Sequence, residues 1–197
     1  MTMPFDTLTA ASDEALLVLY ANGDPVAARA LADRLVPRLL RFATRMLNDA
    51  TEAEDVAQEA MLRLWRIAPE WRTGEAKVST WIWRVVANLC TDRLRKRRTV
   101  ALDAGPEPED GAPSALAGLI ESDRAAALEA ALTALPDRQR QAVVLRHLEG
   151  LTNPEIAEIM QIGVEAVESL TARGKRALSA MLAGRKAELG YDAEDGG

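Results

Sequence analysis

The sequence has very little cysteine or histidine. Its 197 residues include one cysteine, Cys90, and one histidine, His147. A single cysteine excludes an intramolecular disulfide and is typical of proteins in a reducing cytoplasm. One cysteine and one histidine also cannot supply the ligands of a Cys/His zinc cluster. We therefore expect neither a metal nor another cofactor in this protein.

Aromatic residues and long apolar runs are also scarce. Aromatics make up 4% of the chain, although hydrophobic residues make up 48%. Alanine and leucine are abundant and β-branched runs are few, which favours packed helices over a sheet. No apolar run reaches the roughly 18 residues of a membrane span, so we expect none. The N-terminus lacks the pattern of a secretory signal, so a cytoplasmic protein is expected.

Charge is plentiful, and its two signs are separated along the chain. The net charge of −6 argues against a protein that simply coats nucleic acid. Residues 79–98 hold six basic side chains and one acidic one, whereas residues 101–123 hold six acidic and no basic ones. The glycines and prolines of this second stretch are typical of an extended linker.

These patterns predict an all-α protein of two small helical domains joined by a flexible acidic linker. We expect the first domain at residues 12–98, the linker at 99–120 and the second domain at 121–183. Residues 184–197 are predicted to be a disordered acidic tail.

The first domain has helical apolar spacing in four segments. Thr51 and Glu54 have the spacing of a capping box, which predicts a helix start at that point. Pro69 would end that helix, and Pro37 could kink the one before it. The other predicted helices are Asp13–Ala21, Pro25–Leu47 and, after a loop over Trp71–Val78, Ser79–Arg98.

The second domain is predicted to contain four helices. Thr152 and Glu155 form a further capping box, and the tight turn Gln161–Gly163 separates the last two helices. This is the helix-turn-helix pattern, which by itself is weak evidence of DNA binding. The predicted helices are Glu121–Ala134, Pro136–Leu148, Thr152–Met160 and Val164–Leu182.

Asp55, Gln58 and Glu59 fall on one face of their helix, opposite Val56 and Ala60. From the spacing alone, this is either a solvated acidic face or a docking surface for a basic partner helix.

The long helix and the loop before it combine aromatic and basic residues. Arginines beside Trp81 suit a surface that holds phosphates and unstacked bases. Alternatively, Trp81 packs in the core and the cations of Arg93–Arg98 favour the helix C-terminus through its dipole. Five cations in six positions repel one another unless something anionic neutralises them, so both interpretations stay open.

Three motifs follow one another along the chain. They are Leu40–Ala43 with Glu54–Trp65, Ser79–Leu89 with Asp92–Arg98, and Leu135–Arg140 with Leu148–Glu158. In this order they resemble sigma factors of the extracytoplasmic-function (ECF) group of the sigma-70 family. The first two motifs resemble successive parts of region 2, and the third is similar to region 4.

The resemblance implies the two folds, a sigma-2-like bundle and a sigma-4-like helix-turn-helix, and a role for each site. Polymerase contacts are implied for Asp55, Gln58 and Glu59. Recognition of the promoter −10 element is implied for Ser79, Thr80, Trp81, Arg84, Asn88, Asp92, Arg95, Lys96, Arg97 and Arg98. Contacts with the −35 element are implied for Thr152, Glu165, Ser169, Arg173, Lys175 and Arg176.

The resemblance also implies the activity and the partners. The protein would bind core RNA polymerase, through the clamp of its largest subunit and the flap of its second-largest, and direct promoter-specific initiation without catalysing a reaction. An anti-sigma factor would hold it inactive until a stress or environmental signal arrives.

The chain departs from the family pattern at the −35 reading helix. Its first turns carry Glu165 and Glu168 and no cation. A carboxylate accepts from cytosine N4 but is repelled by phosphate, so weak −35 affinity of the isolated chain is expected.

The acidic linker is either a solvated spacer or, as in the family, a nucleic-acid mimic in the polymerase channel. In that case neutralising Asp103, Glu107, Glu109 and Asp110 would change abortive-transcript length.

Two other functions fit parts of the sequence. A stand-alone helix-turn-helix regulator would bind promoter DNA without polymerase, which the first domain and the net charge disfavour. A nucleic-acid enzyme would need a phosphate loop, a metal cluster or a nucleophile set, which the sequence lacks.

Cys90 is expected to be a buried small residue and His147 a structural one.

Overall fold

The computed structural model describes residues 10–72, 74, 77–104 and 121–183. Every regular element in these ranges is a helix, so the predicted all-α class is confirmed. The predicted linker beyond residue 104 and the predicted tail at 184–197 lie outside the described residues. So do most of the carboxylates proposed for the polymerase channel.

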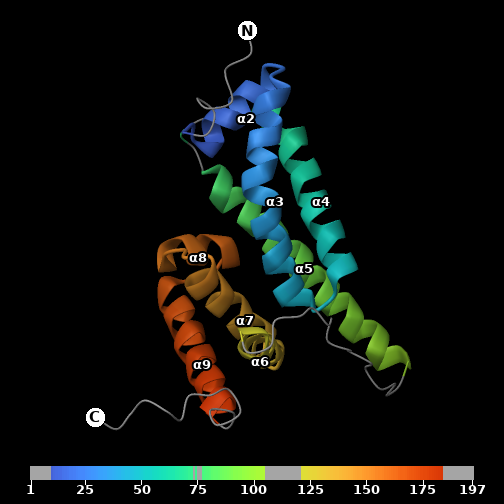
Figure 1. The fold of residues 1–197 in the computed structure, drawn as a ribbon, viewed down its shortest axis with the longest axis vertical. Coiled ribbons are helices and arrows are strands. Elements are labelled where there is room, and N and C mark those ends of the chain that lie inside the picture. Colours follow the sequence, from blue (N-terminus) through green and yellow to red (C-terminus); the bar gives the residue numbers. More distant parts are fainter. Residues whose placement is uncertain (1–9, 73, 75–76, 105–120, 184–197) are drawn as a thin grey trace.

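The first domain, residues 10–104, is an antiparallel arrangement of helices around an apolar core. In Figure 1, α3 and α4 lie side by side, α2 covers one end and α5 crosses behind them. The helices are α2 (Asp13–Ala21), α3 (Pro25–Leu47), α4 (Ala50–Ile67) and α5 (Val78–Ala104), with a 3₁₀ turn at Ala68–Glu70.

Two helix boundaries differ from the sequence prediction. Helix α4 is capped by Asp49, whose carboxylate accepts from the backbone N–H of Glu52 at 3.0 Å, so the predicted Thr51 capping box is wrong. Asp49 also forms an ion pair with Arg97 of α5 at 3.2 Å. The uncharged hydroxyl of Thr51 could not form such a pair. Helix α5 continues past Arg98 to Ala104, so the start of the predicted linker is helical. Helix α3 runs through Pro37 without a break.

Trp83 is the largest fully buried side chain of the first domain. Its ring meets Phe42 edge-on with centroids 5.4 Å apart, and the Arg38 guanidinium lies 5.3 Å from its centroid. The aromatic pair contributes about 1 kcal/mol beyond its area burial. Trp81, for which core packing was one of the two interpretations of the sequence, is only half-buried.

The second domain, residues 121–183, packs α7 and α8 against the long α9. The Thr152–Glu155 capping box is present, with Glu155 accepting from the Thr152 backbone N–H at 3.0 Å, as predicted. The predicted helix Pro136–Leu148 is instead α7 followed by a π-helical turn. The elements are α6 (Glu121–Thr133), α7 (Asp137–Val143), the π turn Val144–Leu148, α8 (Asn153–Met160) and α9 (Val164–Ala183).

The two domains pack directly on each other. Helix α8 lies against α5, and both α6 and α7 contact α3 (Figure 1). The buried residues of both domains form one continuous apolar cluster. This packing places the second domain beside the face of α5 on which the −10 residues were predicted.

Candidate nucleic-acid and partner interfaces

The predicted polymerase-contact residues lie together on the outer face of α4. Asp55 and Gln58 are exposed, and the Asp55 carboxylate lies 3.7 Å from the Arg93 guanidinium. Glu59 accepts a hydrogen bond from Arg63 at 2.8 Å, and this bond keeps the pKa of Glu59 below its usual value. The lowered pKa keeps Glu59 ionised near neutral pH, and an acidic face of this kind suits a basic partner.

An apolar groove, which sequence reasoning missed, runs beside this acidic face between α3 and α4. Leu62 on its wall is 45% exposed. Gln58 and Glu54 form its polar edge. The remaining lining residues are apolar: Ala32, Val36, Leu40, Ala57, Met61, Leu62 and Trp65. No single stretch of the sequence signals this groove, because it forms only where α3 and α4 pack side by side.

The start of α5 brings Ser79, Thr80, Trp81 and Arg84 together on one helix end. Glu14 of α2 accepts from the Val78 backbone N–H at 3.0 Å and so caps this helix. Burial raises the pKa of Glu14, but the hydrogen bonds from its own backbone and from Val78 outweigh burial and lower it. Ser79 and Arg84 are half-buried, and Thr80 is 8% exposed.

Trp81 stands against a second tryptophan. Its ring meets Trp71 edge-on, with centroids 6.2 Å apart. Trp71 precedes α5, and the sequence prediction placed it in a loop without a role. Because both rings are half-buried, the pair presents aromatic surface next to Ser79 and Thr80. Such surface can stack on an unpaired base.

Further along α5, Asn88 and Asp92 are exposed one helical turn apart. Asp92 accepts a hydrogen bond from Arg95 at 2.9 Å. An exposed asparagine amide can both donate to and accept from a base edge, so this part of the helix retains the polar groups that base reading needs.

Much of the basic run is neutralised inside the protein. Arg97 donates to the Leu47 carbonyl at 2.7 Å and pairs with Asp49 and Glu52. Arg93 donates to the Glu52 carbonyl at 3.1 Å. The mutual repulsion of these cations is therefore relieved in part by carboxylates of α4 and its cap, so the basic run does not require an outside anion to neutralise it.

The remaining cations of the run point elsewhere. Lys96 and Arg95 are exposed, whereas Arg98 pairs with Asp137 of the second domain at 3.0 Å. Arg95 and Lys96 therefore project from the fold, where an anionic partner can reach them, whereas Arg98 is exposed but already engaged by Asp137.

Helix α9 presents its predicted DNA-contact residues on one open surface. Glu165, Ser169, Arg173, Lys175 and Arg176 are all exposed. Glu168 accepts from the Asn153 side-chain amide at 3.4 Å, which ties the start of α9 to α8. The Thr152 hydroxyl, by contrast, lies in the capping box, 2.8 Å from the Glu155 carboxylate.

In the described ranges, no helix is long and apolar enough to cross a membrane. The same residues contain no group of three or more histidine, cysteine or acidic side chains that could hold a metal ion. Cys90 is fully buried, as predicted, and burial raises the pKa of its thiol to about 12.

Two family models match the two domains in the predicted order. The model described as Sigma-70 region 2 matches residues 31–100, and the model described as Sigma-70, region 4 matches residues 125–178. Together they cover more than half of the chain.

Two individual sigma factors that are similar to this chain show which group of the sigma-70 family it belongs to. The chain is 32% identical to the ECF RNA polymerase sigma factor SigW of Bacillus subtilis, over 82% of this chain and 91% of SigW. It is 33% identical to the ECF RNA polymerase sigma factor SigE of Mycolicibacterium smegmatis, over 89% of this chain and 70% of SigE. The chain belongs to the sigma-70 family. Within that family it is a member of the ECF group of RNA polymerase sigma factors.

Solved structures share the fold. CnrH, solved in complex with the cytosolic domain of CnrY, matches with a TM-score of 0.66 and 24% identity, over 88% of this chain and 99% of CnrH. RpoE of Bartonella quintana, solved in complex with the anti-sigma factor NepR, matches with a TM-score of 0.64 and 22% identity, over 79% of this chain and 96% of RpoE.

Membership of the ECF group gives the activity in outline. The chain is a transcription initiation factor that works with core RNA polymerase at promoters.

Proposed function

We propose that the first domain docks on core polymerase through the α3–α4 groove and the acidic residues beside it. The single observation that carries this proposal is the apolar groove between α3 and α4 with the acidic face of α4 beside it. Exposed Leu62 and half-buried Trp65 supply apolar area, and Asp55 and Glu59 supply negative charge. An amphipathic helix with basic flanks fits such a surface. In the ECF group that partner is the clamp of the largest polymerase subunit.

The α5 surface then reads the −10 element as single-stranded DNA. Trp71 and Trp81 provide a stacking surface, and the exposed Asn88 amide can make two hydrogen bonds to a base edge. Flipping a base out of the duplex costs a few kcal/mol, which stacking and hydrogen bonds in a pocket recover. Arg95, Lys96 and Arg98 hold phosphates, while Arg97, engaged with Asp49 and Glu52, contributes mainly by fixing α5 against α4.

Helix α9 enters the major groove of the −35 element with its N-terminal half. Glu165 and Ser169 face the bases, and Arg173, Lys175 and Arg176 follow the phosphates. The early carboxylates favour cytosine and weaken non-specific binding. Thr152 acts through its cap on α8. The second domain also contacts the flap of the second-largest polymerase subunit.

The biological setting follows from the group. An anti-sigma factor restrains the protein in the cytoplasm, as the anti-sigma factor NepR binds the fold relative RpoE. A stress or environmental signal releases it. The chain itself catalyses no reaction. It changes which promoters the polymerase opens.

The docking proposal is tested by Leu62→Arg in the full chain, with affinity for core polymerase measured by fluorescence anisotropy. A cation in the groove repels a basic partner helix, so we expect affinity to fall at least tenfold. Val100→Arg is the matched control, because Val100 is 57% exposed and lies outside the groove. Equal affinity of the Leu62→Arg variant and wild type would overturn the docking proposal.

A further inference from the structure

We infer that Glu14 is a positioning residue for −10 recognition, because it holds the first turn of α5, which carries Ser79, Thr80 and Trp81, in place. This inference rests on the proposed role of α5. Glu14 lies on α2, outside the three sequence motifs and outside residues 31–100, which match Sigma-70 region 2. Its effect on DNA would pass through α5, without a contact of its own.

Helix α5 does not cap its own start. The backbone N–H of Trp81 donates to the Lys77 carbonyl at 3.1 Å, so Lys77 occupies the N-cap position. An N-cap side chain normally accepts a hydrogen bond from the first turn, and a lysine ammonium has no acceptor. The Glu14 carboxylate supplies one, since it accepts from the Val78 backbone N–H at 3.0 Å. The start of α5 therefore depends on a side chain of α2.

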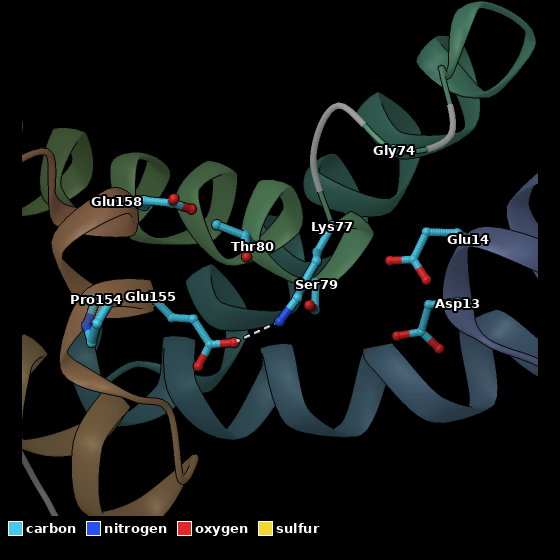
Figure 2. A pocket seen from close by; sticks show the side chains of 9 residues that line it. All are labelled: Asp13, Glu14, Gly74, Lys77, Ser79, Thr80, Pro154, Glu155 and Glu158. Atoms are coloured by element: carbon cyan, nitrogen blue, oxygen red, sulfur yellow. Dashed lines mark hydrogen bonds and ion pairs between the residues drawn. The ribbon is translucent and has the colours of Figure 1, made fainter.

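The charge of Glu14 suits the start of a helix. The unpaired N–H groups there carry partial positive charge, which a carboxylate stabilises. Burial raises the pKa of Glu14, but hydrogen bonds from its own backbone and from Val78 lower it below its usual value, so the group is ionised near neutral pH. Figure 2 shows the carboxylate pointing from α2 toward the start of α5, with Asp13 beside it. A negative charge here is unfavourable for DNA, and the capping of α5 offsets that disadvantage.

Helix α2 is itself fixed to two other helices, so Glu14 has a defined position. Arg34 of α3 pairs with Asp13 at 3.2 Å. Near the other end of α2, the Tyr20 ring lies against Trp65 of α4, with centroids 4.5 Å apart. Helix α2 is thus anchored on α3 and α4, and Glu14 extends this anchoring to α5.

Helix α2 also contacts the chain at two places that flank the aromatic pair. It packs on the 3₁₀ turn Ala68–Glu70, directly before Trp71, and it reaches Val78 through Glu14. Trp71 and Trp81 meet edge-on with centroids 6.2 Å apart. Helix ends fray when their backbone groups lose partners. Loss of the Glu14 bond is therefore expected to loosen the first turn of α5 and with it the Trp81 ring.

Asp13 provides a matched control for Glu14. It lines the same groove but pairs with α3 and not with α5. Glu14→Ala and Asp13→Ala each remove one negative charge from this groove, whereas Glu14→Gln keeps an oxygen that can accept from the Val78 N–H. If Glu14 were only a charge near DNA, all three variants would favour promoter binding. A positioning role predicts a loss for Glu14→Ala alone.

Two quantities are measured with the full-length chain and core polymerase. Affinity for core is measured by fluorescence anisotropy, and the amount of open complex at saturating chain by permanganate reactivity of unpaired −10 thymines. The template is a promoter mapped from the transcripts that overproduction of the chain induces. We expect Glu14→Ala to lower the open complex about tenfold, as loss of one hydrogen bond to a charged group would. Its affinity for core should stay within about twofold of wild type. Asp13→Ala should match wild type in both quantities, and Glu14→Gln should recover most of the loss.

A Glu14→Ala variant whose open complex stays within about threefold of wild type would overturn the inference. An equal loss in Asp13→Ala or in Glu14→Gln would also overturn it. If Glu14→Ala does not fold, as judged by circular dichroism, Glu14→Asp replaces it. The shorter side chain keeps the charge but withdraws the acceptor from Val78, so the same loss is required. Absence of open complex with the wild-type chain would instead contradict the proposed role of α5, and the inference would fall with it.

Discussion

The Arg140 guanidinium of α7 donates to the Met46 carbonyl at the end of α3, 2.7 Å away and shielded from solvent. The same side chain donates to the Thr133 and Leu135 carbonyls. It thus ties together the turn between α6 and α7 and fastens the second domain to the first.

Replacing Arg140 with Met is therefore expected to destabilise the chain by about 3 kcal/mol, because three carbonyls, two of them in buried hydrogen bonds, lose a charged donor. Chemical denaturation followed by circular dichroism measures this. Arg138→Met, at an exposed position two residues away, should change the unfolding free energy by less than about 0.5 kcal/mol. Equal effects of the two substitutions would contradict the assigned role of Arg140.

Gly174 lies in the middle of α9, where alanine would normally improve a helix. Here a Cβ would sit 2.6 Å from Val143 Cγ2 of α7. We expect Gly174→Ala to destabilise the second domain by about 1–3 kcal/mol through overpacking. Val143→Ala removes the obstructing methyls, so the double variant should recover part of the loss. A stabilising Gly174→Ala would show that α7 and α9 are not this close.

The capping box of α8 should make stability depend on pH. Hydrogen bonds from the Thr152 backbone and hydroxyl lower the pKa of Glu155 from its usual 4.5, and Lys77 lowers it further. A lowered carboxyl pKa gives stabilisation that is present above pH 4.5 and is lost as the pH falls through the folded-state pKa.

Glu155→Gln should accordingly cost about 1 kcal/mol at pH 7, and the difference from wild type should shrink as the pH falls below 4.5. Denaturation curves across this range supply the test. A difference that stays constant with pH would mean that the charge of Glu155 contributes nothing to the cap.

Cys90 should be inert in the folded chain. Its thiol is buried and its pKa is raised to about 12, so almost no thiolate is present near neutral pH. Labelling with a maleimide at pH 7.5 should be at least about 100-fold slower in buffer than in concentrated guanidinium. Thr99→Cys in a Cys90→Ser background supplies an exposed control. Comparable rates at the two positions would contradict the burial of Cys90.

The helices were largely predictable because their signals are local. The apolar periodicity of α3 and the Thr152–Glu155 capping box each lie within one element and reappear in the structure. The start of α4 was not predictable, since Asp49 and Thr51 are both good caps. The choice depends on Arg97, which reaches Asp49 from α5, far along the chain.

The candidate site was predictable as a set of residues but not as an arrangement. The motifs placed Asp55 on α4 and Asn88 on α5, and both are exposed there. The sequence could not show that Arg97 is occupied inside its own domain while Arg98 crosses to Asp137. Nor could it reveal the α3–α4 groove, because that surface exists only once two helices pack side by side.

The central claim, that this chain gives core RNA polymerase its promoter specificity, is tested most directly by reconstituted transcription. The template is a promoter mapped from the transcripts that overproduction of the chain induces. We predict initiation at the mapped start only when chain and core are both present, with little binding of the duplex by the chain alone. Tight sequence-specific binding by the chain alone, with no change in where core polymerase initiates, would contradict the claim.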